Sequence, residues 1–221
     1  MSLDLYLDTA DTQQWNALMP TGMFSGITTN PLLAQRAGLS YPDIDWSELA
    51  RKAAGLGANE LHAQVFGVVE TYAPWADALL EAGAKAGIRT VVKVPLVETA
   101  IREVPRLKSM GCPILMTACY DAKQMIVATS LGADFIAPYY GRILEAGLPA
   151  FEMLSQMVAI QKSGGTRILV ASLRSTEQLC ELSTIGCDCF TISPDIARAL
   201  LSDELSLAAV NDFENAARDI F

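Results

Sequence analysis

Lys93 is the residue whose type and position point most directly to chemistry. It is the cation inside the apolar run TVVKVP at residues 90–95, whose β-branched valines are typical of a buried strand. Burial removes water from an amine, which disfavours its charged form and lowers its pKa. A neutral amine is a nucleophile that can form a Schiff base with a carbonyl substrate. The alternative for this segment alone is that Lys93 lies at the strand end and extends its amine to water.

Polar side chains also stand where the other predicted strands end. Short runs rich in apolar and β-branched residues predict eight strands, at residues 3–7, 24–28, 61–66, 90–94, 114–117, 135–137, 168–171 and 189–192. The polar residues that end or follow these runs are Asp8, Thr28, Thr29, Asn30, Gln64, Lys93, Thr117, Tyr139, Arg142, Ser172, Thr191 and Ser193. Some have a simpler alternative, because Asp8 or Thr9 can cap the helix that follows, and Ser172 can cap a helix that begins near Arg174. Asn30 can belong to a turn before Pro31, and Gln64 can be a satisfied amide of the core.

The segments between the strands are predicted to be helices, so strand and helix alternate along the chain. Their apolar residues recur at three- and four-residue spacing, and a glycine stands just before several strands, where a helix C-cap is expected. Eight such units in 221 residues predict one α/β domain, a (β/α)8 TIM barrel over residues 1–221. In that fold the C-terminal ends of the strands surround one mouth, which would bring the polar residues together.

The composition excludes several classes of function. The formal net charge of −9 and the pI of about 4.6 argue against a nucleic-acid partner, which needs basic patches. No apolar run has the length of a membrane span, and the N-terminus MSLDLYLD lacks a basic region followed by an apolar core, which predicts a cytoplasmic protein. The five cysteines are an odd number in predicted strands and helices, so buried free thiols are expected. A single histidine argues against a histidine-based metal site or triad.

Seven motifs carry a resemblance to a known family. LYLDTAD, GITTNP, HAQVFG, VVKVP, LMTACY, IAPYYGRI and ILVASLRS resemble the successive strand-end motifs of the transaldolase family, and most closely its short branch, which includes fructose-6-phosphate aldolase. The likeness runs from about residue 5 to about residue 197. TTNP, the lysine of VVKVP and the AP-Y-x-x-R segment are specific in combination. The resemblance implies a class I enzyme that needs no metal or other cofactor and acts on a sugar or sugar phosphate.

The resemblance also implies a role for each matching residue. Lys93 would form the Schiff base, Asp8 would hold a hydroxyl of the donor sugar and assist proton transfer, and Tyr139 would act as acid and base. Thr117 and Gln64 would hold a catalytic water. The residues implied to bind the substrate are Thr28, Thr29 and Asn30 at the donor fragment, Arg142 and Ser172 at the phosphate, and Arg174 as additional charge near it.

Two positions bear on which reaction follows. True transaldolases of this family resemble a site with glutamate on strand three and phenylalanine after strand six, whereas this chain has Gln64 and Tyr139. A glutamine cannot donate the proton that a glutamic acid can, while a tyrosine hydroxyl can do acid–base work. The pattern favours reversible aldol cleavage of a ketose or ketose phosphate, such as fructose 6-phosphate, into a dihydroxyacetone unit and an aldehyde. The alternatives are a transaldolase of the pentose phosphate pathway and a sugar-phosphate-binding barrel without turnover.

The chain departs from the family after Arg142. An acidic, glycine-rich stretch is usual there, but residues 143–150 read ILEAGLPA, which is more apolar and leaves the identity of the acceptor open. Residues 205–221 are predicted to form an amphipathic C-terminal helix with Leu207, Val210 and Phe213 on one stripe. The stripe can pack on its own barrel or on a neighbouring subunit. Short-branch members resemble ring-shaped pentamers that pair into decamers, so a homo-oligomer is expected.

Overall fold

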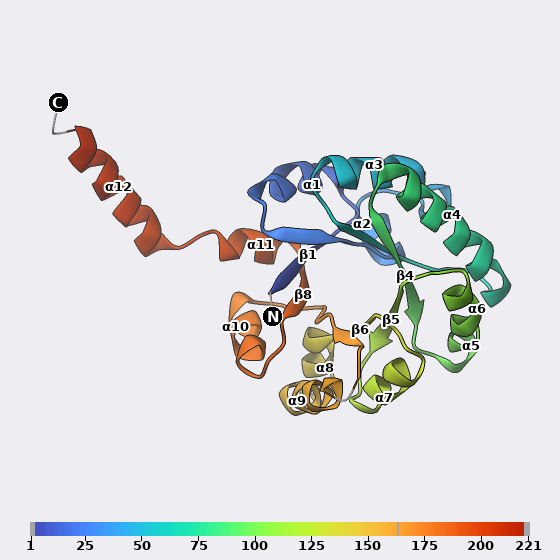
Figure 1. Ribbon diagram of the computed structural model, residues 1–221. Coiled ribbons are helices and arrows are strands. Elements are labelled where there is room, and N and C mark those ends of the chain that lie inside the picture. Colours follow the sequence, from blue (N-terminus) through green and yellow to red (C-terminus); the bar gives the residue numbers. More distant parts are fainter. Residues whose placement is uncertain (1–2, 163, 219–221) are drawn as a thin grey trace.

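A computed structural model of the chain describes residues 3–162 and 164–218, and these residues contain eight parallel strands in one sheet (Figure 1). The strands follow one another around the sheet in the order β7-β6-β5-β4-β3-β2-β1-β8. Their bounds are β1 Asp4–Asp8, β2 Phe24–Thr28, β3 Glu60–Gln64, β4 Arg89–Pro95, β5 Ile114–Cys119, β6 Phe135–Pro138, β7 Arg167–Ile168 and β8 Cys189–Ile192. The predicted (β/α)8 barrel is confirmed.

The barrel closes where β7 meets β8. β7 ends at Ile168, earlier than the predicted strand 168–171, but the chain beyond it keeps pairing with both neighbouring strands. An isolated parallel bridge joins Val170 to Phe190, with the Val170 amide 2.9 Å from the Cys189 carbonyl. A second bridge joins Ala171 to Tyr139. The ladder here consists of single bridges, so the seventh strand is short although its residues lie where the sequence predicts.

Helices surround the sheet on its outer side, apart from the last one, α12 (Figure 1). Their bounds are α1 Thr12–Leu18, α2 Pro31–Arg36, α3 Trp46–Gly55, α4 Tyr72–Ala86, α5 Glu98–Ile101, α6 Val104–Ser109, α7 Lys123–Ser130, α8 Tyr140–Glu145, α9 Ala150–Gln161, α10 Thr176–Thr184, α11 Pro194–Leu200 and α12 Glu204–Arg218. Single 3₁₀ turns lie at Met19–Thr21, Tyr41–Asp43 and Val69–Thr71. Four of the five cysteines are buried as predicted, but Cys180 is exposed because it lies on the solvent side of α10.

Two apolar clusters fill the fold, one between strands and helices and one inside the barrel. The inner cluster includes Tyr6, Val91, Leu115 and Ala137. Side chains alternate between the two faces of a strand, so the residue two positions further on also points into the barrel, nearer its C-terminal end. Those residues are Asp8, Lys93, Thr117 and Tyr139. Each of four strands therefore has an apolar residue inside the barrel and, two positions further on, a polar residue that points inward at the mouth.

The opposite end of the barrel is closed by charged groups. Glu60 accepts hydrogen bonds from the Tyr6 hydroxyl at 2.7 Å and from Nε2 of the fully buried His62 at 2.8 Å, and it pairs with Arg89. Burial alone would raise the pKa of Glu60, but these partners outweigh it and lower that pKa to about 2. A carboxylate with this many partners is a structural group, as is typical of the N-terminal face of such barrels.

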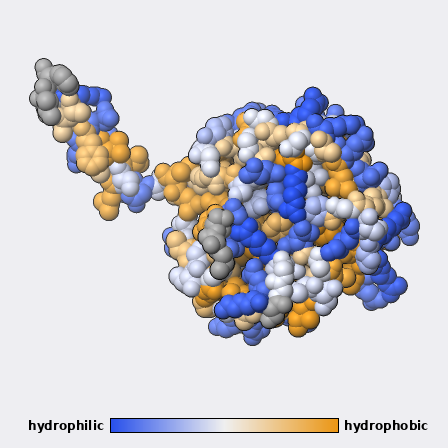
Figure 2. Space-filling view, viewed as in Figure 1, coloured by the Kyte–Doolittle hydropathy of each residue, from blue (hydrophilic) through white to orange (hydrophobic). Residues whose placement is uncertain are grey.

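The C-terminal helix α12 stands away from the barrel (Figure 1). None of its described residues is buried, and the side chains of Leu205, Leu207, Val210 and Phe213 are all exposed. Figure 2 shows their apolar surface along one side of the helix. The helix is where the sequence predicts it, with the end of the predicted range at 219–221 outside the described residues, but it does not pack on its own barrel. The described helices include none long and apolar enough to cross a membrane.

Candidate functional site

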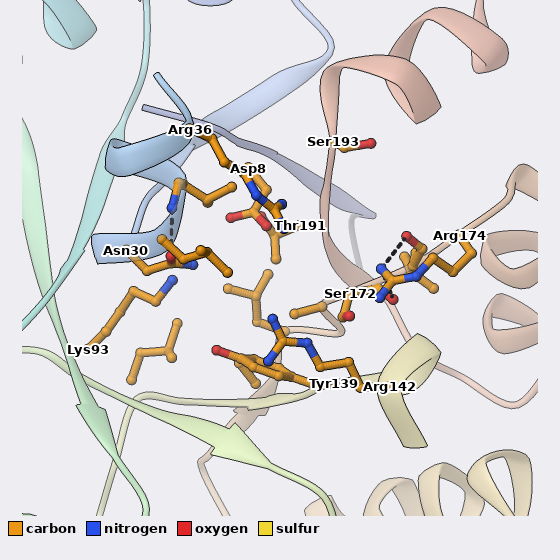
Figure 3. Close-up of a pocket in the computed structure, with 17 residues that line it drawn as sticks. Asp8, Asn30, Arg36, Lys93, Tyr139, Arg142, Ser172, Arg174, Thr191 and Ser193 are labelled. Atoms are coloured by element: carbon orange, nitrogen blue, oxygen red, sulfur yellow. Dashed lines mark hydrogen bonds between the residues drawn. The ribbon is translucent and has the colours of Figure 1, made fainter. Parts of the chain in front are cut away.

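A cavity of about 220 Å³ opens at the C-terminal ends of the strands (Figure 3). Seven of the residues predicted from the sequence line it: Asp8, Asn30, Lys93, Tyr139, Arg142, Ser172 and Arg174. They come from five of the eight strands, β1, β2, β4, β6 and β7, or from the segments that follow them. The structure thus brings into one place residues up to 166 positions apart, from Asp8 to Arg174.

Lys93 lies at the floor of this cavity. It points into the barrel from β4 and only 4% of its surface is exposed, so its amine does not extend to bulk water. Desolvation by burial lowers the pKa of Lys93 below its ordinary value of 10.5, and the nearby Asp8 carboxylate acts in the opposite direction. Because its pKa is lowered, Lys93 loses its proton at a lower pH than an exposed lysine does. The amine is therefore suited to nucleophilic attack on a carbonyl carbon.

Asp8 is held in place by two threonines. The Thr28 hydroxyl donates to Asp8 Oδ1 at 2.6 Å, and the Thr191 hydroxyl lies 2.5 Å from that of Thr28. Thr28 does not line the cavity, so it orients the carboxylate from behind. The alternative in which Asp8 caps a helix is wrong, because α1 is capped by Asp11, whose carboxylate accepts from the Gln13 amide at 2.8 Å.

Tyr139 brings a phenol to the cavity from the end of β6. Its hydroxyl lies 2.8 Å from that of Thr117, which does not itself line the cavity, and the Arg142 guanidinium lies 5.1 Å from the centre of its ring. Burial raises the pKa of Tyr139 above its ordinary value of 10.0. The phenol consequently keeps its proton at neutral pH and is available as a proton donor.

Asn30 serves both the fold and the cavity. It is the N-cap of α2, where its Oδ1 accepts from the Leu33 amide at 3.0 Å and Pro31 occupies the first turn (Figure 3). The cap uses the side-chain oxygen, so the amide nitrogen is the group that remains for a ligand. Asn30 therefore has a local structural role before Pro31, and this role leaves its amide nitrogen available for the predicted binding.

Thr29 and Gln64 do not line the cavity. The Thr29 hydroxyl is buried without a hydrogen-bond partner among the described residues. Gln64 is partly buried at the end of β3, beside Lys93 in the strand register, and its backbone amide and carbonyl both bond to the Tyr41 hydroxyl, at 2.8 and 2.7 Å. The structure places Gln64 next to the lysine, and its predicted part in holding a water stays a prediction.

The loops after β6 and β7 form the opposite wall, where Arg142 and Ser172 lie. The Gly141 amide donates to the Ser172 carbonyl at 3.0 Å, and a Cβ at Gly141 would lie only 2.1 Å from that oxygen, so glycine is required there. Ser172 has the left-handed φ of 63°, which is uncommon for a residue with a side chain and marks a constrained turn. It does not cap a helix, because α10 begins at Thr176 with Ser175 in the N-cap position.

Arg174 lines the same wall but is already engaged. Its Nε donates to Glu145 at 2.8 Å, and its Nη1 donates to the Ser172 carbonyl at 3.0 Å. These contacts tie α8 to the turn that carries Ser172. The segment after Arg142 departs from the family pattern by being more apolar. Two of its residues, Ile143 and Ala150, are buried in the apolar cluster between strands and helices, which explains their apolar character.

Three polar residues that line the cavity were not assigned to the site from the sequence: Arg36, Thr191 and Ser193. Thr191 and Ser193 were visible as polar groups at the end of β8, and Ser193 also caps α11 by accepting from the Ile196 amide at 3.4 Å. Arg36 gave no signal in the sequence. It is the last residue of the six-residue helix α2, a position that normally faces solvent.

Comparison with known proteins agrees with the geometry. A sequence model of the Transaldolase/Fructose-6-phosphate aldolase family matches residues 5–220. A probable transaldolase from Phenylobacterium zucineum (strain HLK1) is 30% identical over 213 residues, covering 96% of this chain and 94% of that protein. Another, from Roseobacter denitrificans, is 29% identical over 216 residues with the same coverage.

Similar solved structures agree on the fold alone. A thiamine phosphate pyrophosphorylase from Pyrococcus furiosus superimposes with a TM-score of 0.63 at 15% identity, covering 88% of this chain and 87% of that one. A mandelate oxidase variant superimposes with a TM-score of 0.62 at 15% identity, covering 89% of this chain and 66% of that one. At 15% identity, this structural similarity supports the barrel fold and gives no information about the reaction.

Proposed function

Because this chain belongs to the transaldolase/fructose-6-phosphate aldolase family, we propose that it is a class I aldolase that reversibly cleaves a ketose or ketose phosphate such as fructose 6-phosphate. The observation that carries the proposal is the presence of the buried Lys93 amine and the Tyr139 phenol in one cavity. A class I aldolase needs an amine that converts the ketose carbonyl into an electron-accepting iminium. It also needs a proton donor for the carbanion equivalent that cleavage leaves. Such a metabolic enzyme is expected in the cytoplasm.

The reaction proceeds through covalent capture of the sugar. The Lys93 amine adds to C2 of the ketose, and loss of water gives an iminium. Asp8 accepts the proton of the 4-hydroxyl, the C3–C4 bond breaks, and its electron pair moves into the iminium to form an enamine while the aldehyde leaves. Tyr139 then donates its proton to C3 of the enamine. Water adds to the resulting iminium, which releases dihydroxyacetone and regenerates the amine, while the proton that Asp8 took from the 4-hydroxyl returns through solvent to the Tyr139 phenolate.

The remaining polar groups orient the substrate. Thr28 fixes the Asp8 carboxylate, and Thr117 fixes the Tyr139 hydroxyl and, with Gln64, holds the water that adds to the iminium. Asn30, with Thr29 behind it, binds the hydroxyls of the dihydroxyacetone unit. Arg142 and Ser172 bind the phosphate at the far end of the sugar, and Arg174 adds positive charge behind Ser172.

The second candidate is a transaldolase, which passes the enamine to a second aldose instead of a proton. It is favoured by the similarity to proteins named probable transaldolases. The two reactions share every step up to the enamine, so only its fate separates them. The phenol of Tyr139 favours protonation, and with it cleavage.

Cleavage of fructose 6-phosphate is expected without any added acceptor. The measurement is release of glyceraldehyde 3-phosphate, coupled to a dehydrogenase, in the presence and absence of erythrose 4-phosphate. Turnover that requires erythrose 4-phosphate would assign the chain to the transaldolases. Absence of both turnover and a reducible adduct with dihydroxyacetone would leave the binding barrel without catalysis.

We also propose that the protein is a homo-oligomer joined through α12. The exposed stripe of Leu207, Val210 and Phe213 has no partner within the described chain, and burial of such side chains against another subunit is favourable by about 1.5–3 kcal/mol each. Pentamers or decamers are the expected assemblies because short-branch relatives resemble such rings.

Phe213→Asp is expected to shift the protein to smaller species, because it places a charge on the apolar stripe. The matched control is Asn215→Asp, which adds the same charge about 200° around the helix. Sedimentation velocity at equal protein concentrations compares both variants with the parent. A parent that sediments as a monomer, or a Phe213→Asp variant with the parent's mass, would contradict an assembly through this stripe.

A further inference from the structure

Arg36 is a cation of the cavity that the proposed function leaves without a role. It ends α2, which begins just after Asn30, and its side chain lines the cavity. Within residues 3–162 and 164–218, its guanidinium makes no hydrogen bond or ion pair. The chain has a formal net charge of −9, so a positive charge without a partner in the described chain is unexpected at the mouth of the cavity.

Arg36 and Arg142 enter the cavity from facing walls. Figure 3 shows Arg36 reaching in from α2 above Asp8 and Arg142 reaching in from α8, with both guanidinium groups directed into the space between. Among the described residues, Arg142 donates a single long hydrogen bond of 3.3 Å, to the Tyr120 hydroxyl. Most of its donors, and all those of Arg36, remain for a ligand.

Arg174 differs from these two in its contacts. It pairs with Glu145 at 2.8 Å and donates to the carbonyls of Ser172 and Leu173 at 3.0 and 3.3 Å. A phosphate placed directly on Arg174 would compete with the Glu145 carboxylate and be repelled by it. The contacts of Arg174 hold the turn of Ser172 in place instead.

We propose that Arg36 joins Arg142 and Ser172 in holding the terminal phosphate of the substrate across the mouth of the cavity, while Arg174 chiefly positions Ser172 from behind. This inference rests on the proposed function, since it assigns a phosphorylated substrate to the same cavity. A phosphate dianion suits two guanidinium forks, which each provide paired donors. Anchoring from both walls also places the sugar across the mouth, with its far end reaching down to Lys93.

The binding of glycerol 3-phosphate tests the assignment, because this compound has the terminal phosphate but no carbonyl that could react with Lys93. Isothermal titration is made on the parent and on Arg36→Gln, Arg142→Gln and Arg174→Gln. Loss of a hydrogen-bonded charge contact weakens binding by about 10- to 100-fold, so this loss is expected for Arg36→Gln and Arg142→Gln and a smaller one for Arg174→Gln. The control is Arg51→Gln on α3, an exposed residue outside the cavity lining whose guanidinium donates to the Ser47 carbonyl of its own helix.

Three outcomes would overturn the inference: a parent that does not bind glycerol 3-phosphate, an Arg36→Gln variant that binds it as the parent does, or equal losses in Arg36→Gln and Arg174→Gln. Reduction with cyanoborohydride in the presence of unphosphorylated dihydroxyacetone separates this test from that of the proposed function. The parent and Arg36→Gln are both expected to form the Lys93 adduct. Failure of the parent to form it would refute the aldolase proposal while the phosphate titration still decides the role of Arg36.

Discussion

Lys93→Met is expected to lower the turnover of fructose 6-phosphate by at least about 10⁴-fold, because it removes the nucleophile on which every later step depends. The same change should remove the stable mass adduct that borohydride reduction produces with dihydroxyacetone. Methionine has nearly the length of lysine without its amine, so the barrel should still fold. An adduct of unchanged yield in this variant would show that another amine reacts.

The matched control for this change is Lys85→Met. Lys85 lies on the exposed side of α4 and pairs with Glu81 at 2.6 Å, so its loss should leave both turnover and the adduct unchanged. Thermal unfolding of both variants checks that the fold is intact. Lys93→Met should be at least as stable as the parent, since the parent must bury an amine that is costly to desolvate.

The buried position of Lys93 also predicts the direction of the pH dependence. Desolvation lowers the pKa of this amine below 10.5, with Asp8 opposing the shift. The neutral, reactive fraction therefore rises with pH as the pH passes this lowered pKa. Adduct formation trapped with cyanoborohydride should increase with pH and reach its plateau at lower pH than the reaction of an exposed lysine.

Tyr139→Phe is expected to lower cleavage of fructose 6-phosphate by about 10²- to 10³-fold while keeping the Lys93 adduct. The change removes the hydroxyl 2.8 Å from that of Thr117, and with it the proposed donor to the enamine. Carbon–carbon bond breaking and capture by an added aldose do not need that proton. Transfer to erythrose 4-phosphate should therefore fall less than cleavage, and the ratio of transfer to cleavage should rise.

Tyr140→Phe is the control for the loss of a phenol hydroxyl at the neighbouring position. The Tyr140 hydroxyl donates to Glu181 at 3.1 Å on α10, away from the cavity, so cleavage should be unaffected. Burial raises the pKa of Tyr139, so its phenol is protonated through neutral pH and the comparison can be made at one pH near 7. A Tyr139→Phe variant that cleaves as fast as the parent would remove this residue from the mechanism.

The reactive groups at the mouth could be predicted because they follow the alternation of the strands. Asp8, Lys93 and Tyr139 each lie two residues beyond an inward apolar residue, and parallel strands in a barrel end at one mouth. A period of two fixes the face on which a side chain lies, so no knowledge of the tertiary contacts was needed.

What depends on contacts between elements could not be predicted in the same way. The hydroxyls of Thr28 and Thr117 act on side chains 20 and 22 residues away, which depends on the stagger of neighbouring strands. Arg36 depends on how the short helix α2 lies over the mouth, and helix periodicity alone places a C-terminal arginine in solvent. The pairing of Arg174 with Glu145 likewise requires the end of α8 to meet the loop that follows β7.

The histidine beneath the site gives the molecule a built-in spectroscopic probe. His62 is the one histidine of the chain, it is fully buried, and its ring lies 4.9 Å from that of Tyr6 inside the barrel. Burial chiefly lowers its pKa, and the charge of Lys93 contributes in the same direction, so the ring senses that charge. Its imidazole resonances are free of overlap from other histidines. Their displacement in a nuclear magnetic resonance spectrum would follow the permanent positive charge of an iminium as it forms and disappears, without any label on the substrate.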